Sequence, residues 1–289
     1  MIPLLSIIIP TYNAELYLKN TIDSVLCQSF QNFDIVIIND GSTDNTKEII
    51  EAISKNDSRI KYKTIPNSGV SNARNEGLKS TKSRYVLFLD ADDLLSTNFL
   101  QNRIIFLEAH QEYSICGSTI STFINEGEHI LTAMHAPNEN GLRDILLYDP
   151  TVASIPSNLM IRADRLRKNE ITFRTSLNST ADKFFLLELF KAGFISKSIE
   201  NAPLYYRIHG NSMSQKISKK LFDDNLNYFN LIVSEKLVPS EILIKVKQKN
   251  YYILSGLSKK LKLYHKTFNF LMKYFSLYLV SIFKVKYKL

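Results

Sequence analysis

Three carboxylates lie within four positions of one another, at Asp90, Asp92 and Asp93, directly after the apolar run 85–89. Like charges at this spacing repel each other, so folding gains little from them. Divalent cations such as Mg²⁺ and Mn²⁺ prefer oxygen ligands and often bind through one or two carboxylates together with substrate phosphates. The cluster indicates a metal or phosphate site, while a solvated turn that caps the following helix is the alternative.

A second chemistry also fits an Asp-x-Asp motif that follows a strand. Phosphatases of the haloacid-dehalogenase type carry Asp-x-Asp-x-Thr/Val and use the first Asp as nucleophile. Here the fifth position is Leu94, and the preceding strand is the fourth of the chain rather than the first. Both departures count against a phosphatase.

The elements that must position these carboxylates alternate regularly over the first 110 residues. The continuous apolar run 4–9 predicts a strand buried on both faces. Further strands are predicted at 33–39, 60–65 and 85–90, and helices at 14–28, 42–55, 70–82 and 96–110. This order predicts a mostly parallel sheet with helices on both faces, whose ligands lie beyond the carboxyl ends of the strands. Asp40 and Asp90 both fall at such ends.

The rest of the chain follows a different pattern. Between about 111 and 220 short strands and loops surround one clear helix at 180–193, and from 220 onward the sequence predicts helices rich in Lys, Tyr, Phe and Leu. The net charge is +8, yet residues 242–289 contain eleven lysines, no arginine and no acidic residue, which leaves residues 1–241 at −3. The basic character therefore belongs to the tail.

Composition and the N-terminus bear on the compartment. The two cysteines, Cys27 and Cys116, form no Cys-x-x-Cys motif, which favours a reducing environment. The segment "MIPLLSIIIPTYN" lacks the basic start and cleavage site of a signal peptide, and no run reaches the roughly 18 to 20 apolar residues of a spanning helix. We expect a cytoplasmic protein that is either free or peripheral on the inner face of the cell membrane.

Four motifs occur in a fixed order: "SIIIPTYN" (6–13), "IINDGSTDNT" (37–46), "NSGVSNARNEG" (67–77) and "LFLDADD" (87–93). Together they resemble the inverting family 2 glycosyltransferases of the GT-A fold, of the type that builds bacterial surface polysaccharides. The resemblance is strong over residues 4 to about 110, weaker to about 215 and absent beyond.

The resemblance implies a fold and a domain organisation. The fold class is α/β, with a Rossmann-like GT-A sheet that is mixed, mostly parallel and flanked by helices, followed by a C-terminal helical extension. Residues 1–215 form the catalytic domain, with a nucleotide-binding half at about 1–110 and an acceptor half at about 111–215. Residues 216–289 form the lysine-rich helical tail.

The first three motifs supply candidate nucleotide-binding residues. Pro10, Tyr12 and Asn13 follow the first strand, where a flat base could lie against an aromatic ring. A carboxylate can accept the imide hydrogen of uracil, and the resemblance assigns this role to Asp40. It also implies that Asn67 and Arg74 face the nucleotide; the alternative for Arg74 is a surface salt bridge.

The fourth motif supplies the residues around the diphosphate. The resemblance implies that Asp90 contacts the ribose, or the metal through water, and that Ala91 lines the nucleotide sugar. Asp92 is the expected direct metal ligand. We expect Asp93 to be structural, as a cap of the next helix.

Transfer with inversion needs a general base that deprotonates the acceptor hydroxyl. Family members carry a Glu-Asp or similar pair at the start of a helix in the acceptor half, and the matching stretch "STADKFF" (179–185) makes Asp182 the candidate base. The preceding residue is Ala181, which departs from the common acidic residue. The alternative for Asp182 is an ordinary partner of the helix dipole.

The segment "LYYRIHGNSMS" (204–214) resembles the Arg-x-His segment of the family. By this resemblance His209 completes the coordination of Mn²⁺ or Mg²⁺ and Arg207 meets the diphosphate. The alternative for His209 is a structural role.

The tail leaves three alternatives open. A basic helix with aromatic residues can lie on an anionic membrane surface, can pack on the catalytic domain or a second subunit, or can bind nucleic acid. Phe268, Leu271, Phe275 and Leu279 fall at helical spacing. Nucleic-acid binding usually brings arginine, which the tail lacks, so we expect none.

The expected function is transfer of a sugar from a nucleotide-diphospho-sugar, UDP-linked by resemblance, to a hydroxyl of a glycan or lipid-linked acceptor in capsule, lipopolysaccharide or other surface polysaccharide synthesis. Processive synthases carry Gln-x-x-Arg-Trp and spanning helices; this chain has no tryptophan, which favours single addition. Two rivals stay open. One is a degenerate homologue that only binds nucleotide sugars or acts as a scaffold. The other is a sugar-1-phosphate nucleotidyltransferase, whose Gly- and Lys-bearing signature is missing from "IIIPTYN".

Overall fold

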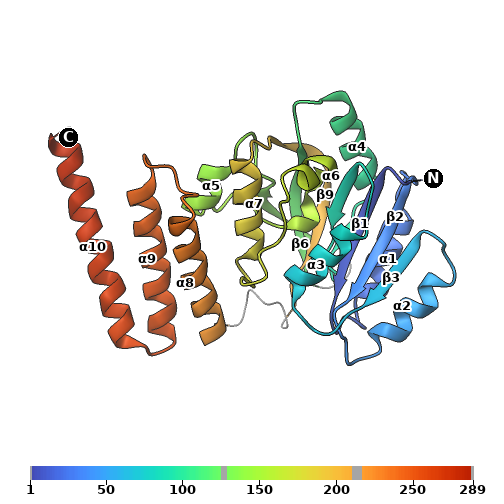
Figure 1. The fold of residues 1–289 in the computed structure, drawn as a ribbon, viewed down its shortest axis with the longest axis horizontal. Helices are drawn as coiled ribbons and strands as arrows, with labels where there is room; N and C mark the ends of the chain where they lie inside the picture. The colour runs from blue at the N-terminus through green and yellow to red at the C-terminus, as the bar shows by residue number, and fades with distance from the viewer. Residues whose placement is uncertain (1, 125–128, 210–216, 288–289) are drawn as a thin grey trace.

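The computed structural model describes residues 2–124, 129–209 and 217–287 (Figure 1). The strands are β1 (Leu5–Thr11), β2 (Phe33–Asn39), β3 (Ile60–Thr64), β4 (Tyr85–Phe88), β5 (Leu94–Leu95), β6 (Ile115–Phe123), β7 (His129–His135), β8 (Met160–Arg162) and β9 (Ser196–Arg207). The α-helices are α1 (Leu18–Leu26), α2 (Thr46–Ser54), α3 (Val70–Lys79), α4 (Phe99–Ala109), α5 (Leu142–Leu147), α6 (Ala163–Lys168), α7 (Ala181–Lys191), α8 (Lys219–Ser234), α9 (Leu243–Lys260) and α10 (Tyr264–Tyr287). A short 3₁₀ helix, η1, spans Pro156–Asn158.

One mixed sheet runs through the molecule in the order β3-β2-β1-β4-β8-β6-β9-β5, with β7 paired to β6. The first four strands are parallel to one another, whereas β8 runs antiparallel to both of its neighbours. The parallel part is the part that the strand–helix alternation predicted. The expected α/β class and mixed sheet are confirmed.

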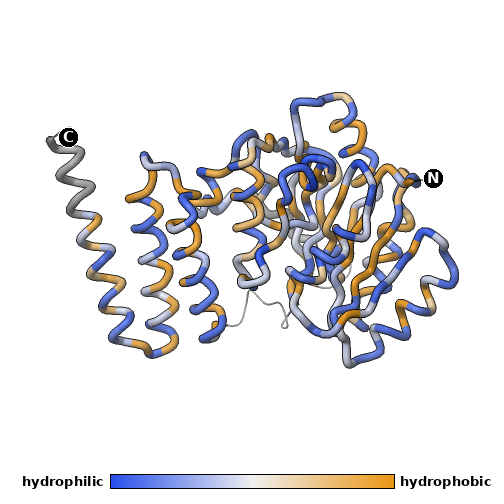
Figure 2. Tube along the Cα trace, in the orientation of Figure 1, coloured by the Kyte–Doolittle hydropathy of each residue, from blue (hydrophilic) through white to orange (hydrophobic). Residues whose placement is uncertain are grey.

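The apolar run of β1 explains why the sheet is covered on both faces. Successive side chains of a strand point to opposite faces. Ile8 therefore packs in one buried layer, while Ile7 and Ile9 pack in the other. The tube coloured by hydropathy shows apolar segments concentrated along these central strands (Figure 2).

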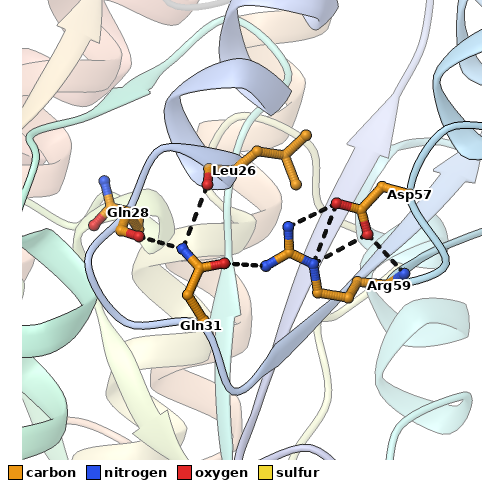
Figure 3. Close-up of polar contacts among 5 residues, drawn as sticks. All are labelled: Leu26, Gln28, Gln31, Asp57 and Arg59. Carbon is orange, nitrogen blue, oxygen red and sulfur yellow. Dashed lines mark hydrogen bonds and ion pairs between the residues drawn. The ribbon is translucent and has the colours of Figure 1, made fainter.

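A polar network lies at the amino-terminal ends of β2 and β3, remote from the candidate site (Figure 3). The side-chain amide of Gln31, just before β2, donates to the carbonyls of Leu26 and Gln28 and accepts from Arg59. Arg59 also pairs with Asp57 at 2.6 Å. The amino ends of β2 and β3 are thus fixed to the end of α1, opposite the carboxyl ends of the strands.

The helix expected over 42–55 begins only at Thr46. Ser42 and Thr43 are instead bonded to Asn13, with Asn13 N donating to Ser42 Oγ and Thr43 N donating to Asn13 Oδ1. Asp44 accepts from the backbone N–H of Glu15. These residues bind the loop after β1, so they do not continue the helix.

A buried arginine positions a loop of the site. The guanidinium of Arg103 in α4 donates from Nη2 to Ser118 Oγ at 2.8 Å and to Asn158 Oδ1 at 2.9 Å. These bonds tie η1 and β6 to α4, and Ser157 of η1 accepts a bond from the backbone N–H of Asp90. Buried polar groups need such partners, which explains why Arg103 is tolerated inside the core.

The C-terminal extension consists of α8, α9 and α10, which lie side by side beyond α5 and α7 (Figure 1). Phe222 and Tyr228 of α8 and Leu254 of α9 belong to the same buried layer as Phe184 of α7. The division at residue 215 stays a prediction. Within the described ranges, no helix is both long and apolar enough to cross a membrane.

Candidate functional site

A salt-bridge triad joins α3, the end of β4 and α7, and we call it the Arg74 triad. Arg74 donates from Nη1 to Oδ1 of Asp182 and from Nη2 to Oδ1 of Asp90, each over 2.6 Å. The Arg74 side chain is 3% exposed and each carboxylate side chain is 29% exposed. The guanidinium is therefore buried beneath carboxylates that solvent can reach, so a surface salt bridge is the wrong description of Arg74.

The second half of the acidic cluster meets the end of β9. His209 Nε2 lies 2.9 Å from Asp92 Oδ2, and the imidazole ring packs against Tyr17 with 4.9 Å between ring centroids. Asp92 and His209, the two expected metal ligands, are thus brought together. The rest of the Arg-x-His segment, from residue 210 to 214, lies outside the described residues.

Arg207 supports the acidic loop rather than reaching away from it. Its Nε donates to the backbone carbonyl of Asp92 at 2.9 Å, and its guanidinium lies between the rings of Tyr17 and Phe123 at 4.9 and 4.5 Å. The side chain is buried. Contact between Arg207 and a diphosphate stays a prediction.

Asp93 is structural, but the expectation that it caps the next helix is wrong. The N-cap of α4 is Asn98, whereas Asp93 is fully buried and its Oδ1 accepts from the backbone N–H of Arg207 at 3.2 Å. Burial, together with the charges of Asp92 and Asp90, holds the pKa of Asp93 well above its usual range. Its role is to tie the loop after β4 to the end of β9.

The loop after β1 contacts the loop after β2. Asn13 has a left-handed backbone with φ of 48°, a conformation that asparagine tolerates better than most residues. The Tyr12 ring is 51% exposed, while Pro10 is buried within β1. An exposed ring beside two polar loops can stack on a flat base, as the sequence predicted.

Asp40 clamps the turn before α3. Its carboxylate accepts from the backbone N–H of Ser68 and of Gly69, each at 2.8 Å, and from Ser68 Oγ at 3.1 Å. A side chain at Gly41, where φ is 71°, would place its Cβ 2.9 Å from the backbone nitrogen of Asn67. An ionised carboxylate has about four acceptor positions, so Asp40 keeps capacity for one more donor.

Asp182 and Asp92, like Asp93, have raised pKa values. Burial raises the pKa of Asp182 to about 6, and the charge of Arg74 limits the rise. Burial, followed by repulsion from Asp90, raises the pKa of Asp92, while the bond to His209 opposes that rise. A cation near Asp92 would relieve this repulsion, because an opposite charge favours the ionised form.

The donor set partly fits a divalent ion. Asp92 and His209 offer a carboxylate oxygen and an imidazole nitrogen, with side chains 32% and 18% exposed. Among the described residues, no group of three or more His, Cys, Asp or Glu side chains is arranged to hold a metal. Mn²⁺ and Mg²⁺ commonly complete their coordination with phosphate and water oxygens, so this pair fits an ion shared with a bound diphosphate.

Ala91 and two residues that the sequence analysis missed complete the site. Ala91 is buried, and its carbonyl accepts from Thr21 Oγ1 of α1 at 2.9 Å. Ser157 holds the backbone of Asp90. Asp224 in α8 accepts four hydrogen bonds from the turn that leads into α7. Neither Ser157 nor Asp224 belongs to a local motif, so no sequence signal marked them.

The fold and this site define a glycosyltransferase of the GT-A class. The family model described as "Glycosyl transferase family 2" matches residues 6–184, and the chain therefore belongs to this family.

Two curated relatives and one solved structure illustrate the likeness. A Bacillus subtilis protein named "Putative teichuronic acid biosynthesis glycosyltransferase TuaG" is 33% identical, over 75% of this chain and 85% of that protein. The Escherichia coli "UDP-Glc:alpha-D-GlcNAc-diphosphoundecaprenol beta-1,3-glucosyltransferase WfaP" is 30% identical over 89% and 95%. S. aureus TarS 1-349 in complex with UDP-GlcNAc has the same fold, with a TM-score of 0.73 and 24% identity over 94% of this chain and 81% of that one. The protein covers only 43% of the length of a longer TarS chain of known structure.

The Arg74 triad makes a stability prediction. Arg74→Ala should lower the free energy of unfolding by about 3 kcal/mol, at the low end for a broken buried pair because both carboxylates stay partly exposed. Urea denaturation followed by circular dichroism measures the change. Arg84→Ala is the matched control, because Arg84 and its partner Glu108 are both exposed. It should lower the free energy of unfolding by less than about 1 kcal/mol. Equal losses in the two variants would contradict the prediction.

Proposed function

We propose that the protein is an inverting glycosyltransferase that moves a sugar from a UDP-linked donor to a hydroxyl of a glycan or lipid-linked acceptor in surface polysaccharide synthesis. The Arg74 triad carries the proposal. Through one guanidinium it joins Asp90, proposed to contact the ribose of the donor or the metal through water, to Asp182, the candidate base. The two halves of a transfer site are therefore held at a defined separation, which positions reacting groups.

Asp182 has the properties of a general base. The bond to Arg74 uses one carboxylate oxygen, so the other oxygen can take the proton of an acceptor hydroxyl. A pKa of about 6 leaves the carboxylate mostly ionised at neutral pH and still basic enough to accept a proton. The hydroxyl oxygen attacks the anomeric carbon as the bond to the diphosphate breaks, and attack from the opposite face inverts the configuration.

The donor is proposed to be UDP-linked for two reasons. Tyr12 offers an exposed ring for the base and Asp40 retains acceptor capacity for an imide hydrogen. TarS is described in complex with UDP-GlcNAc, and the name of WfaP gives UDP-Glc as its donor. Asn67, beside Gly41, is proposed to face the same nucleotide.

Asp92 and His209 are proposed to hold Mn²⁺ or Mg²⁺ together with oxygens of the donor. Such an ion supplies Lewis-acid stabilisation of the negative charge that develops on the departing diphosphate. Arg207 keeps the backbone of Asp92 in place through its bond to the Asp92 carbonyl. The chain thus supplies the ligands and the support that orients one of them.

The names of the relatives support a proposal for the acceptor, and the free cysteines support a proposal for the cellular compartment. The names of TuaG and WfaP refer to teichuronic acid and to a diphosphoundecaprenol-linked sugar, which supports a glycan or lipid-linked acceptor. Cys27 and Cys116 are free thiols, in keeping with a reducing compartment such as the cytoplasm.

The proposal is tested with the purified chain, Mn²⁺ and either UDP-glucose or UDP-GlcNAc. UDP release should be detectable, through slow hydrolysis of the donor alone and through transfer when a lipid-linked sugar acceptor is added. NMR of the glycoside formed with the acceptor should show the inverted anomeric configuration. Asp92→Asn should raise the Mn²⁺ concentration for half-maximal rate by roughly tenfold or more. Asp23→Asn, in the exposed pair with Lys19, is the control and should leave that concentration unchanged. If the protein binds the donor but shows no turnover under all of these conditions, the result would favour a homologue that only binds nucleotide sugars or acts as a scaffold.

The pH dependence tests Asp182 as the base. The value of kcat/KM should rise with pH through an apparent pKa of about 6 and then level off, because only the ionised carboxylate accepts the proton. Asp182→Asn should lower kcat by roughly 100- to 10,000-fold. Asp164→Asn, on the exposed side of α6, should leave both the rate and the profile as in the unsubstituted protein. A flat profile between pH 5 and 8 would exclude Asp182 as the base.

A further inference from the structure

The outer face of α10 is apolar although solvent surrounds it. Tyr264, Phe268, Met272, Phe275 and Tyr278 are between 48% and 67% exposed. They recur every three or four residues and so share one face of the helix. α10 is the helix farthest from the sheet (Figure 1), so this row, which we call the α10 stripe, points away from the body of the protein.

The opposite face of α10 is already occupied. The Phe270 ring lies 6.2 Å from Tyr251 of α9 and 6.1 Å from Phe222 of α8. Lys266 and Lys273 lie over the rings of Phe222 and Tyr251. These contacts occupy the side of α10 that faces α8 and α9, so the α10 stripe is a second apolar face that is left exposed.

The positive charge near the α10 stripe indicates which kind of partner would bind there. Lys245 and Lys249 are exposed on α9, on the same helical side as the exposed Tyr252, whose ring lies 6.0 Å from Tyr274 of α10. The segment 242–289 carries eleven lysines and no acidic residue. A second copy would bring the same positive charge against this surface and repel it. An anionic bilayer offers phosphates to the lysines and an acyl boundary to the aromatic rings.

We propose that the α10 stripe, together with Lys245, Lys249 and Tyr252 of α9, docks the protein onto an anionic phospholipid surface. Binding would rest on two terms, burial of the aromatic side chains and attraction between the lysines and lipid phosphates. This inference does not depend on the proposed activity, because vesicle binding is measured without a sugar donor.

The test is co-sedimentation of the full chain with vesicles. Phosphatidylcholine vesicles that contain about one third phosphatidylglycerol should bind the protein, and phosphatidylcholine alone should bind it much less. Added salt should weaken binding because it screens the lysines. The double variant Phe268→Ser/Phe275→Ser should lower the partition coefficient at least tenfold, since two exposed rings no longer enter the lipid boundary.

Tyr62→Ser, an exposed aromatic position on β3, is the matched control and should bind as the unsubstituted protein does. Equal binding to neutral and anionic vesicles, or unchanged binding of the double variant, would overturn the proposal. A stable dimer that the double variant dissociates, in a protein that does not bind vesicles, would make the stripe a subunit interface instead.

A separate observation concerns Asp224, which lies in α8 but bonds to the start of α7. Its Oδ1 accepts from the backbone N–H of Asn178 at 2.7 Å. Its Oδ2 accepts from Ser179 Oγ and from the backbone N–H and hydroxyl of Thr180, over 2.7 to 3.0 Å. Asp224 is buried, and Thr180 is the N-cap of α7. The helix that carries Asp182 is therefore capped by a carboxylate from the C-terminal extension.

We infer that Asp224 is a positioning residue for Asp182, a step that rests on the proposed function. The three bonded residues immediately precede α7, and Asp182 is its second residue. A carboxylate at a helix N-terminus also interacts favourably with the helix dipole. Loss of these bonds would let the first turn of α7 move relative to the Arg74 triad, and small displacements of a reacting group are costly in rate.

The test compares Asp224→Asn with Asp223→Asn, an exposed neighbour in α8. Asp224→Asn should lower kcat between roughly tenfold and a hundredfold with little change in KM for the UDP-sugar, because the proposed donor contacts lie on the strand ends. Asp224→Glu, which restores the carboxylate, should recover part of kcat. Asp223→Asn should match the unsubstituted protein. Equal changes in kcat and KM, or no change in kcat, would overturn the positioning role.

Amide hydrogen exchange separates this inference from the proposed function. The N–H groups of Asn178 and Thr180 should exchange faster in Asp224→Asn, whatever the protein catalyses. If the unsubstituted protein shows no turnover, the proposed function fails while the cap can still be seen in the exchange rates. Unchanged exchange at both amides would remove the basis of the inference.

Discussion

One buried positive charge holds the candidate site together. Arg74 pairs with Asp90, 16 residues away in the chain, and with Asp182, 108 residues away. Two carboxylates that share one guanidinium are held in fixed positions, and each would be left without its counter-charge if the arginine were absent. Arg74 therefore directly links the strand end to the start of α7.

Several carboxylates lie close to Arg74, and not all of them have a positively charged partner among the described residues. Asp92 and Asp93 lie two and three residues after Asp90. Burial raises the pKa of both; repulsion from Asp90 adds to the rise at Asp92, and repulsion from Asp92 and Asp90 adds to it at Asp93. Arg207 contributes hydrogen bonds to the loop, while its guanidinium lies between two aromatic rings. Carboxylates with perturbed pKa values are found more often at functional sites than elsewhere in proteins.

The C-terminal extension is connected to the site in two physical ways. The side chains of α8 and α9 enter the buried layer that also contains α7. Asp224 then makes its bonds to the turn before α7. A segment that the charge pattern marks only as a lysine-rich tail thus packs against the helix of Asp182, while its last helix turns an apolar face outward.

The sequence by itself determined the strand–helix alternation, the parallel half of the sheet and the acidic cluster at a strand end, because periodicity and strand-end residues are local properties. It also indicated Arg74, Asp182 and His209 as members of one site through motifs. Only the tertiary structure decided that Asp93 bonds to Arg207, 114 residues away, and that Asp224 caps α7 from 44 residues beyond. Such contacts arise where elements pack against each other, and no local pattern encodes which buried acceptor will meet which donor.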